Sequence, residues 1–346
     1  MLGGYMIASN SVRRTLPNWF QAMAVDVNYS TFLVDGKYQL QEFLGEGAMS
    51  AVYRGIERKT NKPIAVKIMK RNLLHDEENV TRFVREVRLS RSITHKNIVR
   101  VFDGGTLSTG EPYMIMELLH GKSIAEILEA QTVLPAARAL NLMHQAAQGL
   151  ALAHKRGYVH RDIKPENLMV VEDVFQRECL KVLDFGVAKL SDALQQSEKF
   201  ATAPGDVLGT PLYMSPEQIR GEKLDGRADV YSLGCVLYQC LCGKSAIQGD
   251  NAITVMRSHL ESTPPHLNYY AAKKLPEEIN SLVQKAIAKD PNDRYKSMAE
   301  FAEVLSKYTT PPLIARFRSL LNLDKGKTDG PPRPTRAKKV KFKKKK

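Results

Sequence analysis

The chain has 346 residues, of which 43% are hydrophobic and 25% are charged. This length can bury one large core or two modest ones, and the composition is that of a globular protein. The net charge is +14, but eleven Lys or Arg and one acid lie in residues 325–346, so this segment contributes +10 and the other 324 residues only +4. Residues 1–324 are therefore only mildly basic.

No apolar run reaches the roughly 18 residues that a membrane-spanning helix needs. The longest candidate, residues 230–242, is predicted to be a core helix. Residues 1–14 have no charged region ahead of an apolar one, so they do not indicate a secretory signal. We therefore expect a cytoplasmic protein without a transmembrane segment. The four cysteines lack C-x-x-C spacing and are expected to be buried reduced thiols rather than metal ligands or disulfides: Cys179, Cys235, Cys240 and Cys242.

Residues 1–37 show no clear periodicity, and we predict a flexible N-terminal extension. The alternative is that residues 16–20 (LPNWF) dock on a surface. From Tyr38 the pattern changes, and residues 38–44 alternate as a strand does. The strand leads into residues 45–53 (GEGAMSAVY), where two glycines separated by one residue allow a tight turn and close approach to phosphate oxygens. An ordinary hairpin is the alternative.

A single Lys stands in the apolar strand predicted over residues 64–69, and this Lys67 needs a partner for its charge. The following helix, predicted over residues 79–92, carries an apolar stripe of Val80, Phe83, Val84 and Val87. Its best-placed acid is Glu86.

Two further strands are predicted over residues 98–103 and 112–117, joined by a Gly-rich turn. Residues 118–121 then break the pattern, as a hinge between a strand-rich and a helical part does. Amphipathic helices are predicted over residues 123–130 and 135–155, with Gly157 suited to the C-terminus of the second helix.

Residues 160–167 (HRDIKPEN) place an acid, a cation and an amide within six residues. Phosphoryl transfer needs this combination: an acid for the incoming hydroxyl, a cation for the phosphoryl charge and an amide oxygen for a metal ion. His154 and His160 could each serve as a base, but Asp162 is the better candidate. Residues 184–186 (DFG) follow, and their Asp is suited to Mg²⁺.

Residues 191–208 are polar and rich in hydroxyls, which predicts a mobile segment. Residues 209–217 (GTPLYMSPE) close this segment, and they resemble a protein kinase motif that usually ends in Ala-Pro-Glu. This resemblance implies that Glu217 pairs with Arg294 and that Asp229 caps the backbone of residues 160–167. Residues 313–323 form a short basic amphipathic helix candidate, and the Lys-rich remainder is predicted to be disordered.

Together these motifs resemble those of eukaryotic-type (Hanks-type) serine/threonine protein kinases. The phrases NIV (97–99), YMSPEQ (213–218) and DVYSLG (229–234) resemble the bacterial branch most. The resemblance implies an α+β, two-lobed kinase fold over residues 38–308, with a strand-rich N-lobe (38–117) and a helical C-lobe (118–308). Residues 309–346 would form a short amphipathic segment and a basic tail.

The resemblance also implies an ATP- and Mg²⁺-dependent enzyme that acts on Ser or Thr of proteins. Lys67 would pair with Glu86 and hold the α/β-phosphates, Asp162 would be the base, Lys164 would contact the γ-phosphate, and Asn167 and Asp184 would bind Mg²⁺. The implied nucleotide site comprises Leu44, Gly45, Glu46, Gly47, Ala48, Met49, Ser50, Ala51, Val52, Ala65, Lys67, Glu86, Met116, Glu117 and Leu119. Backbone groups of Glu117 and Leu119 would meet the adenine edge, with Met116 behind it.

Thr202 is the expected activating phosphosite, because it lies eight residues before Thr210, the spacing found in bacterial relatives. Ser197 is the competitor, and Arg161 could pair with the phosphate. The chain departs from the family pattern at three places: Ser50 replaces the third loop glycine, Ser215 replaces an Ala, and residues 243–247 (GKSAI) stand where Pro-Pro-Phe is usual.

Two other functions compete with catalysis. A pseudokinase that only binds partners would need a lost catalytic position, and none is lost. A nucleic-acid-binding protein could use the basic tail, but the tail has no aromatic residue beyond Phe342 to support base recognition. The tail could also adsorb to an anionic membrane surface at the inner face of the membrane, or remain solvated without a partner. Protein substrates, input signal and oligomeric state are not predicted.

Overall fold

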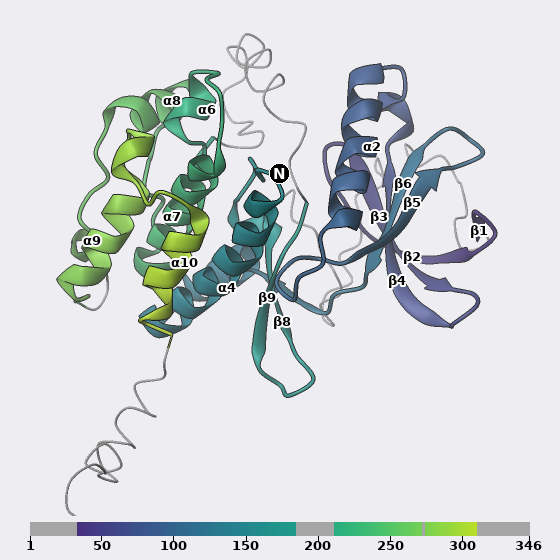
Figure 1. Ribbon diagram of the computed structural model, residues 1–346, viewed down its shortest axis with the longest axis horizontal. Helices are drawn as coiled ribbons and strands as arrows, with labels where there is room; N and C mark the ends of the chain where they lie inside the picture. The colour runs from purple at the N-terminus through teal and green to yellow at the C-terminus, as the bar shows by residue number, and fades with distance from the viewer. Residues whose placement is uncertain (1–32, 185–210, 272–273, 310–346) are drawn as a thin grey trace, which may run out of the picture. The chain divides into compact units, whose positions relative to one another are not determined.

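The computed structural model describes residues 33–184, 211–271 and 274–309 (Figure 1). The predictions for Thr202, for residues 1–32 and for the basic tail lie outside these ranges. Among the described residues, no helix is long and apolar enough to cross a membrane.

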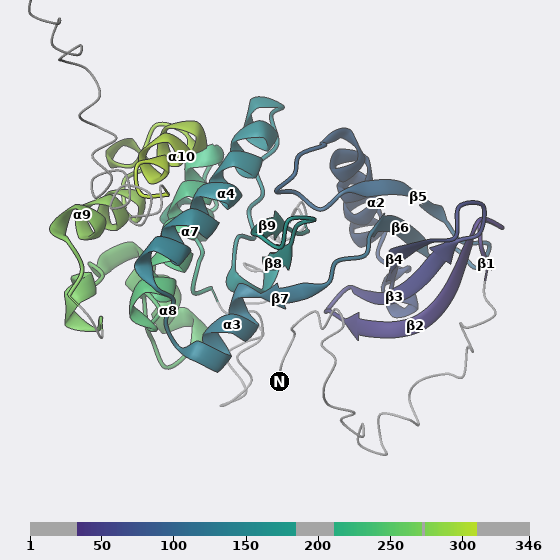
Figure 2. The same cartoon turned by 90° about the horizontal axis from the view of Figure 1, so that it is seen from below.

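The first half of the described chain forms one six-stranded antiparallel sheet with the order β1-β2-β3-β4-β6-β5. Its strands are β1 (Leu33–Val34), β2 (Tyr38–Glu46), β3 (Ser50–Glu57), β4 (Lys62–Met69), β5 (Val101–Thr106) and β6 (Pro112–Glu117). The helix α2 (Glu77–Ser92) follows the short 3-10 turn η2 (Arg71–Leu73) and packs on β5 and β6, so it covers one face of the sheet (Figures 1 and 2).

Strand β1 lies inside the N-terminal extension that was predicted to be flexible. It pairs with β2, and Val34 is completely buried in the sheet's second apolar cluster. Among the described residues, the sheet therefore starts at Leu33, five residues before the predicted start at Tyr38.

Helix α2 begins two residues earlier than predicted because Asp76 caps it. The Asp76 side chain accepts hydrogen bonds from the backbone N–H groups of Glu78 and Asn79, which the first turn cannot satisfy by itself. Phe83 and Val87 of the predicted stripe are buried against the sheet.

The strand predicted over residues 98–103 starts instead at Val101. Ile98 forms an isolated parallel bridge with Val182, so it ties this segment to the second half of the chain. The glycines lie within β5 rather than in a turn: a Cβ on Gly104 would be 2.4 Å from the Val87 side chain, and only glycine lets α2 approach so closely. The turn itself falls at Gly110, with φ at +98°.

The second half is mostly helical, around a small antiparallel sheet with the order β7-β8-β9. Its elements are β7 (Gly121–Ser123), α3 (Ile124–Gln131), α4 (Ala136–Lys155), η3 (Pro165–Asn167), β8 (Leu168–Glu172), β9 (Glu178–Val182), α6 (Pro216–Ile219), α7 (Gly226–Cys242), α8 (Ala252–Glu261), η5 (Leu267–Tyr269), α9 (Glu277–Ala286), η6 (Pro291–Asp293) and α10 (Met298–Ser306). Helix α7 packs on α4, α9 and α10 and is buried along nearly its whole length, which confirms the predicted core helix (Figure 1).

Local chemistry fixes the predicted helix ends. Ser123 and Glu126 form a reciprocal capping box at the start of α3. At the end of α4, Gly157 takes φ +80°, and the N–H groups of Gly157 and Tyr158 donate back to the carbonyls of His154 and Ala153. Three cysteines are buried in α7, as predicted, whereas Cys179 is only half-buried.

Candidate active site

Lys67 occupies the middle of the sheet, opposite Val52 of β3 and Met114 of β6. Only 5% of the residue is exposed. Its Nζ lies 2.9 Å from Glu86 Oε1 on α2 and 2.8 Å from Asp184 Oδ1 after β9. The buried cation therefore has the partner that the sequence predicted and a second carboxylate from the other half of the chain.

The charge on Glu86 depends on this arrangement. Burial raises the pKa of Glu86 above its usual value, the attraction of Lys67 opposes that rise, and the nearby Asp184 carboxylate adds to it. The ionised form of Glu86 is therefore stabilised chiefly by Lys67.

The loop of residues 160–167 brings three predicted residues together. The Asn167 amide nitrogen donates to the backbone oxygen of Asp162 at 2.8 Å and to its Oδ2 at 3.0 Å. Lys164 Nζ lies 3.3 Å from the same Oδ2. The side chains of Asp162, Lys164 and Asn167 are therefore in direct contact, and the Asp162 carboxylate is oriented by the other two.

Asp229, in the first turn of α7, anchors the start of this loop. Its carboxylate accepts hydrogen bonds from the backbone N–H groups of His160 at 2.8 Å and Arg161 at 2.9 Å, as predicted, and its Oδ2 lies 2.7 Å from the His154 ring. Burial opposes ionisation of Asp229, but the hydrogen bonds from His154 and the loop outweigh it, so that its pKa lies below the usual value.

The His160 side chain is completely buried, and its Nε2 lies 2.7 Å from the carbonyl oxygen of Leu183. Burial lowers its pKa, so the ring is neutral. The Leu183 N–H in turn donates to the Asn167 carbonyl at 2.9 Å. His160 therefore ties the loop to the segment that carries Asp184.

Five of the residues predicted to bind the nucleotide lie in or against one apolar cluster. Val52, Ala65, Met116 and Leu119 are buried there, and Leu44 packs against them. The sequence analysis missed Met169 and Leu183, which belong to the same cluster from the helical half. Their signal was weak, because a buried apolar residue in a strand is ordinary in any fold. Within the described residues, the backbone N–H of Leu119 makes no hydrogen bond.

The glycine-containing turn is a hairpin between β2 and β3. The Gly47 N–H donates to the Ser50 carbonyl at 2.8 Å, and Ala48 and Met49 form the tip. Glu46 pairs with Lys70 at 2.9 Å, and the Met49 carbonyl accepts from the Lys70 N–H at 2.9 Å. Lys70 therefore attaches both sides of the hairpin to the end of β4.

Glu217 in α6 and Arg294 form the predicted ion pair. It is bidentate, at 2.6 and 2.8 Å, and the side chains are 5% and 0% exposed, respectively. Arg294 also donates to three backbone carbonyls, those of Ala288, Lys289 and Arg227. The pair therefore fixes α6 to the helical core.

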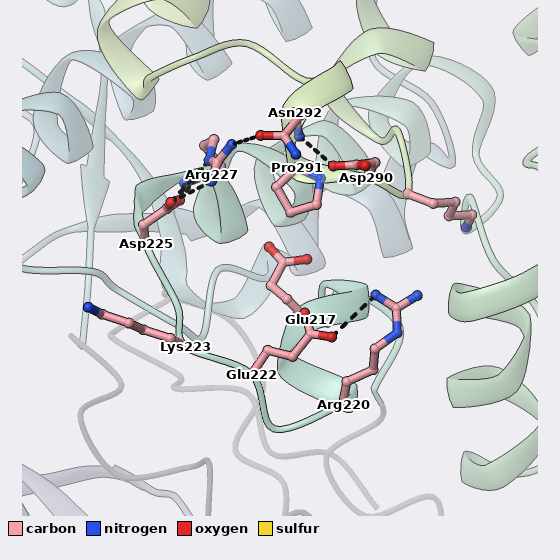
Figure 3. A pocket seen from close by; sticks show the side chains of 10 residues that line it. Glu217, Arg220, Glu222, Lys223, Asp225, Arg227, Asp290, Pro291 and Asn292 are labelled. Atoms are coloured by element: carbon pink, nitrogen blue, oxygen red, sulfur yellow. Dashed lines mark hydrogen bonds and ion pairs between the residues drawn. The ribbon is translucent and has the colours of Figure 1, made fainter.

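A polar hollow beside this pair is distinct from the apolar cluster (Figure 3). Its charged groups largely satisfy one another: Arg227 binds Asp225 and the Asn292 side chain, and Arg220 lies 3.8 Å from Glu222. None of the residues predicted to bind a nucleotide lines it.

Comparison with known proteins supplies the last observation. Residues 38–306 match the protein kinase domain family. The serine/threonine-protein kinase pkn3 of Myxococcus xanthus is 35% identical over 266 residues, which cover 77% of this chain and 48% of that protein. PknB of Mycolicibacterium smegmatis is 36% identical over 267 residues, which cover 76% of this chain and 41% of that protein.

Among solved structures, the kinase domain of Mycobacterium tuberculosis PknI aligns with a TM-score of 0.63 and 24% identity, over 81% of this chain and 98% of that domain. The chain spans about half the length, or less, of these two curated relatives.

Proposed function

The chain belongs to the protein kinase family and has its two-lobed α+β fold, as the sequence predicted, and we propose that it transfers the γ-phosphoryl group of ATP to Ser or Thr hydroxyls of proteins. The relatives it matches are named as serine/threonine-protein kinases of bacteria. The observation that carries the proposal is the constellation around Asp162, with Lys164 and Asn167 on its carboxylate and Lys67 held between Glu86 and Asp184.

Each residue has a distinct task in this proposal. Asp162 orients the acceptor hydroxyl and accepts its proton, because its carboxylate is fixed by Asn167. Lys164, beside that carboxylate, neutralises charge that develops on the phosphoryl group. Lys67 contacts the α/β-phosphates, and Glu86 holds its ammonium in place.

Asn167 and Asp184 suit Mg²⁺ because both offer hard oxygen ligands. The Asn167 amide nitrogen is engaged by Asp162, which leaves the amide oxygen as the end that can meet a metal. Bound Mg²⁺ would supply charge neutralisation of the phosphates.

The apolar cluster fits a planar base, since Val52 and Ala65 lie on one lobe and Met169 on the other. The Leu119 N–H lacks a partner among the described residues and could donate to a ring nitrogen. The hairpin of residues 45–52 would then cover the phosphates with backbone N–H groups.

Radiolabel transfer from ATP to a generic protein substrate tests the proposal. Asp162→Ala and Lys67→Met should each lose at least about 10²- to 10³-fold in turnover, the scale of a lost general base or electrostatic contact. Matched controls are Asp250→Ala and Lys62→Met, because both residues are exposed and Lys62 lies in the same strand as Lys67. Turnover like that of the wild type in Asp162→Ala or Lys67→Met would refute the mechanism.

The proposal extends to regulation through Thr202, which lies outside the described residues. Phosphorylation there would add about −1.5 to −2 charges. The Arg161 guanidinium, next to Asp162, forms no ion pair with a described carboxylate and could receive that phosphate.

For the basic tail, also outside the described residues, we propose adsorption to an anionic membrane surface at the cytoplasmic face, with nucleic acid as the alternative partner. Eleven cations in residues 325–346 support this, since each contributes at most about 1 kcal/mol near such a surface. Sedimentation with phosphatidylserine vesicles across a salt series tests it, and binding that ignores salt, or none at low salt, contradicts it.

A further inference from the structure

The peptide group between Arg161 and Asp162 is held at both ends. Its N–H, on Asp162, points to His160 Nδ1 at 3.3 Å, and its oxygen, on Arg161, accepts a hydrogen bond from Gln218 Nε2 at 2.9 Å. Arg161 has φ at +68°, in the left-handed region that non-glycine residues rarely adopt. The backbone that leads into Asp162 is therefore in a conformation that its surroundings must maintain.

Two helices restrain this backbone. Asp229 of α7 accepts hydrogen bonds from the N–H groups of His160 and Arg161, as described above. Gln218 belongs to α6, the short helix that also carries Glu217. It reaches the catalytic loop across 57 residues of sequence.

The Gln218 amide is itself oriented by Ser215. Ser215 is completely buried and Gln218 is 6% exposed. The backbone N–H and the hydroxyl of Ser215 both lie 3.1 Å from Gln218 Oε1, and the Ser215 hydroxyl accepts the Gln218 N–H, which completes a capping box. With its oxygen bound to Ser215, the amide can only present its nitrogen toward Arg161.

From this geometry we infer that Gln218 is a positioning residue: it fixes the Arg161–Asp162 peptide and so sets the orientation of Asp162. The inference rests on the proposed function, because it assumes that Asp162 is the base. It also links two features that look independent in the sequence, since Ser215 orients Gln218 and Gln218 restrains the loop.

Three variants separate this role from general stability. Gln218→Leu removes the donor and is close in size. Gln218→Glu keeps an acceptor for Ser215 but turns a carboxylate oxygen toward the Arg161 carbonyl. Gln145→Leu is the matched control, because Gln145 also bonds to backbone groups of the helical lobe, those of Glu178 and Leu180, but forms no hydrogen bond with residues 160–167.

The first experiment measures, for each variant, the steady-state kinetics of phosphotransfer and the melting temperature. We expect both Gln218 variants to lower kcat about tenfold with little change in KM for ATP, because a displaced base slows chemistry without touching the nucleotide. Gln145→Leu should lower the melting temperature but leave kcat near the wild type. If the Gln218 variants only lose stability, as the control does, the inference is wrong.

Hydrogen exchange of the full chain is the second measurement, and it needs no catalytic activity. Peptides that span residues 158–167 should exchange faster in Gln218→Leu than in the wild type. In Gln145→Leu the exchange rate of these peptides should equal that of the wild type. Unchanged exchange in Gln218→Leu would overturn the inference. A wild-type protein without phosphotransfer would instead refute the proposed function, and the exchange comparison would still decide the role of Gln218.

Discussion

Replacing Glu217 with Gln should destabilise the folded chain far more than the same change at Glu222, because the Glu217 ion pair is buried and the Glu222 ion pair is not. Glu217 binds Arg294 through both carboxylate oxygens, and the two side chains are 5% and 0% exposed. Glu222 lies in the same segment, but its Arg220 partner is 3.8 Å away and both side chains are about half exposed.

The magnitude follows from what each substitution leaves behind. Removing one partner of a buried ion pair costs about 3–5 kcal/mol, because the other charge stays buried. Arg294 keeps its three carbonyl acceptors and Gln keeps one acceptor oxygen, so we expect the lower end, about 3 kcal/mol. An exposed pair contributes at most about 1 kcal/mol, so Glu222→Gln should have little effect.

Thermal and urea denaturation followed by circular dichroism measure the difference. For a domain that spans residues 38–306, about 3 kcal/mol corresponds to a fall in melting temperature of roughly 5 °C. If Glu217→Gln and Glu222→Gln lie within about 1 kcal/mol of each other, burial does not amplify this ion pair as we argue.

Three further predictions concern other sites. Burial lowers the pKa of His259 to about 3, below its unfolded value, so stability should be lost as the pH falls below 6.5; the loss at pH 5 is about 2 kcal/mol, and urea titrations of His259→Gln should lack it. Burial raises the pKa of the Cys235 thiol to about 12, so the α7 cysteines should resist a disulfide reagent until the protein is denatured, and prompt native reaction of any thiol beyond Cys179 would contradict this. Thr202→Ala should lower activity several-fold and be nearly silent in an Arg161→Ala background, and mass spectrometry that finds the segment unmodified would exclude this regulation.

The predicted contacts rest on two grounds. A charge in an apolar strand must find a partner, so Lys67 required one, whereas Glu86 as that partner and the pairing of Glu217 with Arg294 followed from the resemblance to protein kinases. Both ion pairs are present in the structure. The end of α4 was predictable because Gly157 suits a C-terminal cap, whereas the Asp76 cap that starts α2 two residues early was not predicted.

The features that the sequence analysis missed lack such a constraint. Strand β1 has two residues, too few to show a period, and only its pairing with β2 reveals it. Met169 and Leu183 look like any core residues until the two lobes place them in one cluster. The start of β5 shifted because Ile98 pairs with Val182, and a contact between distant segments leaves no local pattern.

Ser215 shows where reading single positions fails. The sequence showed Ser215 only as a replacement for Ala, and Gln218 carried no prediction of its own. In the structure the pair forms one unit, because the Ser215 hydroxyl and N–H bind the Gln218 amide oxygen and thereby aim its nitrogen at Arg161. An exposed Ser or Gln side chain would hydrogen-bond to water in many orientations. Because Ser215 and Gln218 are buried and bond to each other, their side chains have a defined orientation. The effect of either residue on Asp162 therefore depends on the presence of the other, so their substitutions should not be additive in kcat.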